Sequence, residues 1–136
     1  MLHGWVGGFH GTPISDKPGF KESVYEKDGF RVVDQYGTVG EKSVGTTTIW
    51  MGNKDLWFMS YSGHYRPEDI PFLKKVLSST YQKGEFIGGR GPASACCGDV
   101  VYTNRATGSF AGFRGEETTC DPKGIRGGHS YWGAKI

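Results

Sequence analysis

Gly45-Thr46-Thr47-Thr48, followed at the same spacing by Ser60-Tyr61-Ser62-Gly63, is the stretch that decides the fold, because it recurs seventy residues later. The second copy reads Gly115-Glu116-Glu117-Thr118 and then Ser130-Tyr131-Trp132-Gly133, and the two copies align without a gap. Five of the nineteen aligned positions are identical. A repeat of this length predicts two copies of one β-rich unit that pack together, because each is too small to bury a face alone. The repeat organises the fold but names no chemistry.

The composition predicts one domain that spans residues 1–136 and is large enough to bury a core. Aromatic residues make up 14% of the chain, so Trp, Tyr and Phe supply much of the buried area. Twenty-three glycines and six prolines favour tight turns and short strands over long helices. The net charge is only +2 and the densest basic patch is Lys74-Lys75, so we expect no direct nucleic-acid partner.

Cysteine usage and the first residues bear on the compartment. Three cysteines, of which Cys96 and Cys97 are adjacent, show no CxxC spacing, and we expect reduced thiols in a cytoplasmic protein. Residues 1–9 lack both a positive segment and a sustained apolar run, so we expect no signal peptide. No stretch reaches the roughly 20 apolar residues of a membrane span, which predicts a soluble protein without a membrane partner.

The first repeat, about residues 20–65, reads as a four-stranded antiparallel meander. Alternation begins at Phe20 and passes through a turn at Asp28-Gly29, a recognised hairpin signal. A strand at 44–51 and a turn at 52–55 lead into the last strand, whose two faces are both apolar, which predicts a central position. Residues 1–19 are interpreted as an irregular arm or a short edge strand.

One helix is predicted between the repeats, at about residues 67–83. Apolar residues follow helical spacing at Ile70, Leu73, Val76, Leu77 and Tyr81. Gly84 is placed to end the helix, and a glycine-rich connector follows at 88–92.

The second repeat, about residues 98–136, is predicted to hold strands at 99–105, 109–119 and 128–136, with a hairpin turn at 121–124. The fold class is therefore α+β. Two antiparallel β-meander repeats, joined by one amphipathic helix, form a strongly curved sheet or a partly open barrel.

Several segments together resemble an uncharacterised bacterial family known only as a domain of unknown function. These are Pro18-Gly19, residues 56–63, Phe72-Leu73-Lys74, residues 86–92, Phe113-Arg114-Gly115-Glu116-Glu117 and residues 131–136. The family pattern has a Pro-Gly before a strand and two Phe-x-Gly-x-Glu strands, each followed by a strand with Tyr and Gly. The resemblance covers about residues 12–136.

The resemblance implies a stand-alone domain or one attached behind a helix-turn-helix DNA-binding domain. This chain contains no helix-turn-helix segment, so direct DNA binding does not carry over. The second copy of the motif is intact, whereas the first reads Ser43-Val44-Gly45-Thr46-Thr47 and lacks both Phe and Glu. That difference weakens any role that requires a symmetric pair of carboxylates.

Glu117 is the principal candidate for chemistry, because it lies on a Phe/Gly/Thr face of a strand that is predicted to be internal. A buried carboxylate needs a cationic or hydrogen-bonding partner. We favour a structural partnership with an Arg or a Tyr. The alternatives are a ligand anchor or a general base.

His129 and Tyr131 point the same way from the final strand and align with Met59 and Tyr61 of the first copy. If the copies face each other, these four side chains and Glu117 line one cavity suited to a small molecule. A hydrogen-bonded core or surface histidine explains His129 equally well. The expected ligand-binding set is Trp57, Met59, Tyr61, Arg90, Glu117, His129 and Tyr131.

Three further motifs indicate a functional site less strongly than Glu117 and His129 do. Gly88-Gly89-Arg90-Gly91-Pro92 has glycines and a cation for an anion but lacks the P-loop lysine, so we favour a bent connector. Cys96-Cys97 is interpreted as a pair of buried structural thiols rather than a nucleophile. The four histidines show no paired spacing, so we predict neither a metal site nor a cofactor.

The leading functional hypothesis is a small-molecule-binding or sensing domain with a cavity between the two repeats. Catalytic residues are not identified. One alternative is a small enzyme in which Glu117 and His129 act as base and acid. The other is a homodimeric protein-interaction module that uses an exposed strand edge.

Overall fold

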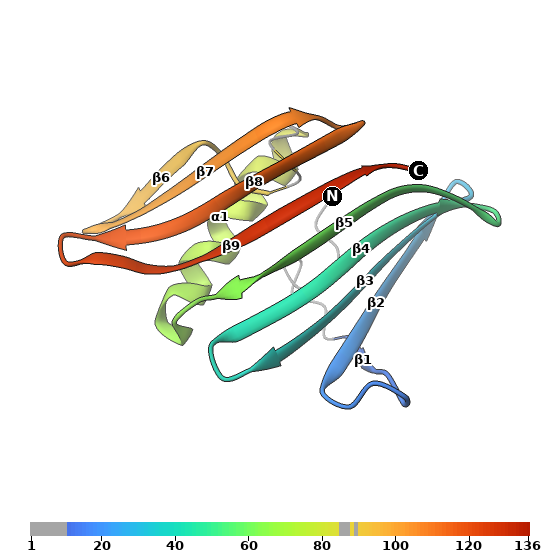
Figure 1. Cartoon of the computed structure of the whole chain (residues 1–136), viewed down its shortest axis with the longest axis horizontal. Helices are drawn as coiled ribbons and strands as arrows, with labels where there is room; N and C mark the ends of the chain where they lie inside the picture. The colour runs from blue at the N-terminus through green and yellow to red at the C-terminus, as the bar shows by residue number, and fades with distance from the viewer. Residues whose placement is uncertain (1–10, 85–87, 89) are drawn as a thin grey trace.

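A single antiparallel sheet of nine strands, with one helix against it, makes up the part of the chain that the structure describes, residues 11–84, 88 and 90–136. The structure is a computed structural model. The strand order is β1-β2-β3-β4-β5-β9-β8-β7-β6, and Figure 1 shows an open sheet whose edges β1 and β6 do not meet. The predicted antiparallel sheet with one short helix is confirmed, and the sheet does not close into a barrel.

The sheet has two halves, the first made of β1 to β5 and the second of β6 to β9, and within each half the strands follow the order of the chain. The strands are β1 Thr12–Pro13, β2 Phe20–Lys27, β3 Phe30–Val39, β4 Lys42–Met51, β5 Lys54–His64, β6 Ser94–Cys97, β7 Val100–Ser109, β8 Gly112–Asp121 and β9 Gly124–Lys135. The helical elements are the 3-10 turn η1 Pro67–Asp69 and the helix α1 Ile70–Lys83. The expected hairpin at Asp28-Gly29 is present, and both residues have positive φ (53° and 82°), as the tight turn requires.

The pairing register is the same in both halves of the sheet. Gly45 lies opposite Tyr61 in the β4–β5 pair, and Gly115 lies opposite Tyr131 in the β8–β9 pair. The register shifts after Ile49 in one pair and after Thr119 in the other, again seventy residues apart. Strands β5 and β9 join the halves, with Tyr61 directly opposite Tyr131. The halves therefore lie side by side in one sheet, whereas the cavity hypothesis assumed that they face each other.

Helix α1 covers one face of the sheet, which we call the inner face, and lies behind β7, β8 and β9 in Figure 1. Its buried residues Leu73, Val76 and Leu77 pack with Tyr65 and with Tyr102 of β7. Gly84 ends the helix with a left-handed backbone (φ 69°), a conformation that glycine adopts without strain. The helix therefore buries the apolar stripe that the sequence predicted.

The strands of the second half differ from the expected boundaries. Ser109 ends β7 instead of opening β8, because residues 110–111 form a tight turn. Strand β9 begins at Gly124 instead of 128; its glycines weaken the strand signal, yet cross-strand hydrogen bonds hold them in the ladder.

Strand β6 was not predicted at all, and it carries the two adjacent cysteines. Cys96 and Cys97 are free and exposed at this edge of the sheet, so the expectation of buried thiols is wrong. A short edge strand leaves side chains on both of its faces close to solvent, which explains the exposure. The proposed arm at 1–19 lies outside the described residues as far as residue 10, and it holds β1 thereafter.

Candidate functional site

The inner face carries a network of polar side chains from β7, β8 and β9, together with Arg90 of the connector. Alternation along the strands points Asn104, Glu117 and His129 to the same face as the buried Tyr102. Arg90 enters from the connector and is buried as well. We call these five residues the polar cluster. Their burial makes every unpaired polar atom costly, so the hydrogen bonds within the cluster carry its explanation.

Glu117 and Arg90 form the central ion pair of the polar cluster. Glu117 is 1% exposed, and Arg90 donates to its Oε1 from Nε at 3.2 Å and also from Nη2. Tyr102 donates its hydroxyl to Oε2. Burial works to raise the pKa of Glu117, but the charge and hydrogen bonds of Arg90 outweigh it and hold this pKa below its ordinary value. Glu117 thus has both of the partner types that the sequence predicted, an Arg and a Tyr.

Arg90 is a structural cation in this arrangement. Its guanidinium contacts Glu117 and lies 5.3 Å from the centre of the Tyr61 ring, a cation–π distance. The neighbouring Gly91 donates its N–H to the Tyr102 hydroxyl at 3.2 Å and accepts from the Asn104 amide at 2.9 Å. The connector is therefore fastened to the sheet, which agrees with the bent-connector interpretation. The positive charge that an anion cradle would need is already neutralised.

His129 is a neutral histidine whose tautomer follows from its partners. Arg90 Nη2 lies 3.3 Å from Nδ1, and a guanidinium can only donate, so Nδ1 accepts. The proton is then on Nε2, which donates to the Ser43 hydroxyl at 2.7 Å. Burial, and after it the charge of Arg90, lower the pKa of His129 to about 4. The Tyr61 and Tyr65 rings pack against the imidazole, with centroid distances of 5.8 and 4.9 Å.

Glu117 and His129 lie together, with 3.6 Å between Oε1 and Nδ1, but they are poorly matched to acid–base catalysis. An efficient general base or acid has a pKa near the working pH. The pKa of Glu117 lies below its ordinary value and that of His129 is about 4, so neither group titrates near neutral pH. The arrangement favours a fixed electrostatic scaffold over proton transfer.

A second, more open group lies on the inner face of the first half. Tyr61 donates its hydroxyl to Asp34 Oδ1 at 3.0 Å, and Thr47 donates to the same oxygen at 3.3 Å. Asp34 is half-buried, and its other oxygen, Oδ2, has no hydrogen-bond partner among the described residues. Burial raises the pKa of Asp34, while the bonds from Tyr61 and Thr47 and the charge of Arg90 act in the opposite direction.

Sequence reasoning missed Asp34, although a signal for it was present. Asp34 follows Val32 by two residues, so in an alternating strand both side chains point to the same face. A carboxylate on the face that carries Val32 is unusual, because charged residues are rarely buried. The same position in the second half is Asn104, and Tyr131 donates its hydroxyl to Asn104 Oδ1 just as Tyr61 donates to Asp34.

The remaining expected site residues lie in the apolar core beside the polar cluster. Trp57 and Met59 are buried with Phe113 and Tyr131. Trp57 stacks on Phe110 and Phe113 at 5.4 and 5.5 Å and donates its ring N–H to the Phe110 carbonyl. The structure therefore brings Tyr61, Arg90, Glu117, His129 and Tyr131 into one neighbourhood, whereas Trp57 and Met59 contribute packing.

Neither a metal-binding cluster nor a membrane-spanning helix is found among the described residues. They contain no group of three or more His, Cys, Asp or Glu side chains placed to hold a metal ion. Among these residues, no helix combines the length and the apolar character that crossing a bilayer requires.

Comparison with known proteins gives a family but no activity. A family model for a domain of unknown function, DUF5680, matches residues 34–127. The match includes Asp34, Arg90 and Glu117 and ends before His129. No curated protein and no solved structure matches the chain.

Proposed function

Since the chain belongs to the DUF5680 family of domains of unknown function, only its own site can suggest an activity, and we propose that it binds a small molecule. The site is the inner face of the sheet beside Asp34 and Tyr61, next to the strands β5 and β9 that join the two halves. Binding requires no catalysis, which suits the fixed charges of the polar cluster.

The observation that carries the proposal is the difference between Asp34 and Asn104. Asn104 is buried and fully engaged, because its amide donates to Gly91 and its oxygen accepts from Tyr131. Asp34 is half-buried, with Oδ1 engaged and Oδ2 without a partner among the described residues. Asp34 Oδ2 is not among the fully buried oxygens without a partner, so it can accept a hydrogen bond from outside the protein. A ligand that supplies the donor takes the place of water at an oxygen whose direction is already fixed by the bonds to Oδ1.

The surroundings of Asp34 favour a compact ligand with a hydroxyl or amine donor and an apolar body. Ile49 and the Tyr61 ring, both half-buried, provide apolar contact area on the same face. The Arg90 guanidinium against the Tyr61 ring adds positive potential, which disfavours a ligand with a large net positive charge. A pocket with apolar walls and a few fixed polar groups is the usual form of a small-molecule site.

The other expected site residues take supporting roles in this proposal. The Tyr61 ring is held by a cation–π contact with Arg90 and by stacking on His129, and Glu117 holds Arg90 through their ion pair. Tyr61 also packs against an apolar cluster that includes Trp57, Met59 and Tyr131. Side chains fixed by such contacts present a binding group in one geometry, which lowers the entropy cost of binding.

Pairing of exposed strand edges, the homodimer alternative, has less support. In the part of the chain that the structure describes, the edges of the sheet are β1 with two residues and β6 with four. Very short edge strands are a common means of preventing strand addition, because they offer few backbone groups to a partner.

We infer, as part of this proposal, that the two halves of the sheet are copies of one unit. The common register, the register shifts seventy residues apart and the paired bonds Tyr61–Asp34 and Tyr131–Asn104 support a duplication. In the second copy the connector covers the polar face, and in the first copy the equivalent face is proposed to receive the ligand.

Placement in the cytoplasm is the last part of the proposal. Its support is the set of free cysteines, of which Cys96 and Cys97 are exposed. Exposed free thiols persist in a reducing compartment and are oxidised elsewhere.

A thermal-shift screen tests the proposed function. The full chain is screened against uncharged or weakly basic compounds that carry hydroxyl or amine donors, and hits are measured by calorimetry. Asp34→Asn keeps the shape of the side chain and should weaken binding at least about tenfold, as expected for a hydrogen bond to a charged group. The control is Glu116→Gln, which also replaces a carboxylate by an amide but at an exposed residue on the opposite face of the sheet. This variant should leave the affinity unchanged. Equal affinity for the Asp34→Asn variant would reject the site.

A further inference from the structure

The face of the sheet opposite α1, which we call the outer face, contains a groove of about 700 Å³. In Figure 1 this face lies toward the viewer, with no helix drawn over it. The groove crosses β5, β9, β8 and β7 and is lined mainly by residues that alternate with the inner-face residues of these strands. The side chains that matter for recognition are Ser62, Arg105, Arg114, Glu116, Ser130 and Trp132.

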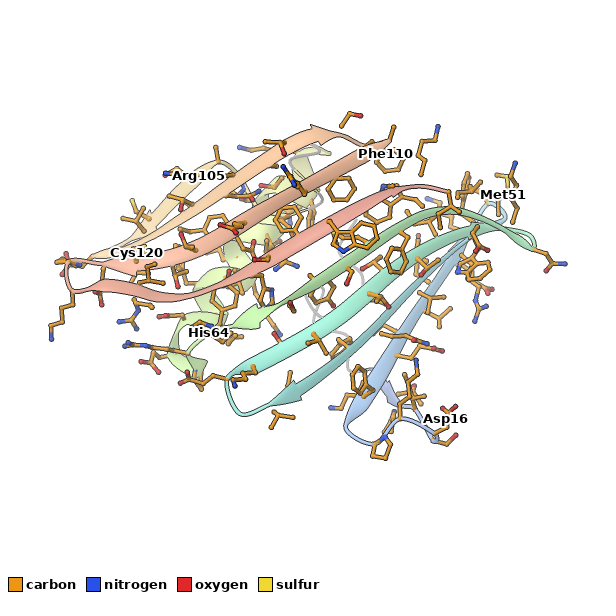
Figure 2. All side chains as sticks on the ribbon, in the orientation of Figure 1. Asp16, Met51, His64, Arg105, Phe110 and Cys120 are labelled. Atoms are coloured by element: carbon orange, nitrogen blue, oxygen red, sulfur yellow. The ribbon has the colours of Figure 1, made fainter. Side chains whose placement is uncertain are left out.

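The groove holds two arginines that the fold does not use. Arg105, which Figure 2 labels on β7, and Arg114 of β8 are exposed, and neither makes an ion pair or a hydrogen bond with the described residues. By contrast, Arg90 and Arg126 are engaged by carboxylates. Arg105 and Arg114 are diagonal neighbours in the β7–β8 pair, a relationship with a spacing of about 7–8 Å that is somewhat shorter between the Cβ atoms. Two guanidinium groups at that spacing can reach one anion together.

An exposed tryptophan lies beside these arginines. Trp132 is 57% exposed and lies directly opposite Arg114 in the β8–β9 pair. Phe58 lies beside its ring, with a centroid distance of 5.8 Å and an interplanar angle of 57°. A large aromatic side chain exposed to solvent offers a stacking surface for a planar or sugar ring.

Two serine hydroxyls complete the lining. Ser62 and Ser130 are exposed and lie directly opposite each other in the β5–β9 pair, next to Glu116 in the β8–β9 pair. Hydroxyls can donate to phosphate oxygens or accept from sugar hydroxyls. The groove therefore combines cations, neutral donors and one aromatic surface within four neighbouring strands.

We propose that the outer groove binds a phosphate monoester carried on a ring, such as a nucleotide or a sugar phosphate. The phosphate lies between Arg105 and Arg114, and the ring stacks on Trp132. Paired guanidinium groups recognise the several oxygens of a phosphate better than a single lysine would. This site is on the opposite face from Asp34 and goes beyond the function proposed for the inner face.

The charge balance of the groove limits the size of the ligand. Glu116 lies directly opposite Arg105 and two residues from Arg114, so the net charge of the three is +1. A nucleic-acid strand requires a longer series of cations, because each phosphate along it must be neutralised. One phosphate on one ring matches the two arginines and the single tryptophan.

The test is calorimetric titration of the full chain with four probes: adenosine monophosphate, glucose 6-phosphate, adenosine and inorganic phosphate. We expect at least one ring phosphate to bind about tenfold or more tightly than adenosine or inorganic phosphate. The ratio of the two ring phosphates identifies the ring, since Trp132 stacks on a base and on a sugar with different strength. No binding of either ring phosphate at millimolar concentration, or equal binding of inorganic phosphate, would overturn the proposal.

Variants separate the outer groove from the inner site. Arg114→Gln and Arg105→Gln should each weaken the ring phosphate about tenfold, whereas Glu116→Gln should strengthen it, because a repelling charge is removed. Trp132→Ala should weaken the ring phosphate but not inorganic phosphate. Asp34→Asn is the control from the inner face and should have no effect. Full affinity in both arginine variants, checked for unchanged melting temperature, would reject the groove while leaving the inner site standing.

Discussion

Arg90 and Glu117, 27 residues apart in the chain, form an ion pair whose side chains are 8% and 0% exposed, and this pair fixes the connector to the centre of the second half-sheet. Two charges at this depth are tolerated because each satisfies the other and Tyr102 supplies a further hydrogen bond. Removing one member leaves the other buried and uncompensated. Substitutions in this pair are therefore expected to change the stability of the fold, whereas substitutions at Asp34 are expected to change ligand binding.

Glu117→Gln should destabilise the fold strongly. Breaking a buried ion pair from one side costs about 3–5 kcal/mol. For a domain of this size the loss corresponds to a melting temperature lower by more than about 10 °C. Glu116→Gln, the adjacent and exposed residue, should stay within about 0.5 kcal/mol and serves as the matched control. Urea unfolding of both variants measures the difference, and similar free energies of unfolding would contradict the structural role of Glu117.

His129 should make the fold less stable as the pH falls from 6.5 toward 4. Its pKa is about 4 in the folded state, below the reference value of 6.5, so the unfolded chain binds the proton first. At about 1.4 kcal/mol per pH unit, the shift corresponds to a loss of roughly 3 kcal/mol across this window. The raised pKa of Asp34 acts in the opposite sense, so His129→Gln is the necessary comparison. Urea unfolding between pH 7.5 and 4 should give a flatter profile for that variant, and an unchanged slope would contradict the assignment.

Tyr61→Phe should raise the pKa of Asp34 further. The Tyr61 hydroxyl donates to Asp34 Oδ1 and favours the ionised form, so its removal leaves burial less opposed. Tyr131→Phe is the control from the other half, because Tyr131 donates to Asn104 instead. Carboxyl-carbon NMR titration of both variants measures the shift. The hydrogen bond would be without consequence if Asp34 titrated identically in the two.

Gly45→Ala and Gly115→Ala should both be destabilising for the same reason. A Cβ at Gly45 would collide with the Tyr61 ring, and a Cβ at Gly115 would collide with the Tyr131 ring and the Arg105 carbonyl. Overpacking of this kind costs about 1–3 kcal/mol. Gly112→Ala, where the added Cβ meets no atom within 4 Å, is the control and should be close to neutral. Thermal melts compare the three variants. An unchanged melting temperature for Gly45→Ala would show that the Tyr61 ring does not pack against Gly45 of β4.

The sequence by itself determined the local structure. Alternation and the Asp28-Gly29 turn predicted the hairpin of β2 and β3, since the side chains of a half-buried strand repeat every second residue. The spacing of Leu73, Val76 and Leu77 predicted α1, because a helix returns to the same face every 3.6 residues. The same local rules could not find β6, whose four residues carry no alternation and are held by pairing with β7.

Only the tertiary structure decided which residues meet. Glu117 was singled out from its own strand, but its partner Arg90 comes from a connector whose path no local pattern encodes. The cavity hypothesis placed the repeats face to face, whereas the pairing of Tyr61 with Tyr131 joins them edge to edge. That choice depends on backbone hydrogen bonds between β5 and β9, which any sequence of strand-forming residues can make. Consequently the sequence identified Tyr61, Glu117 and His129 as site residues, whereas the fold decided their neighbours and burial and added Asp34, which the sequence analysis had missed.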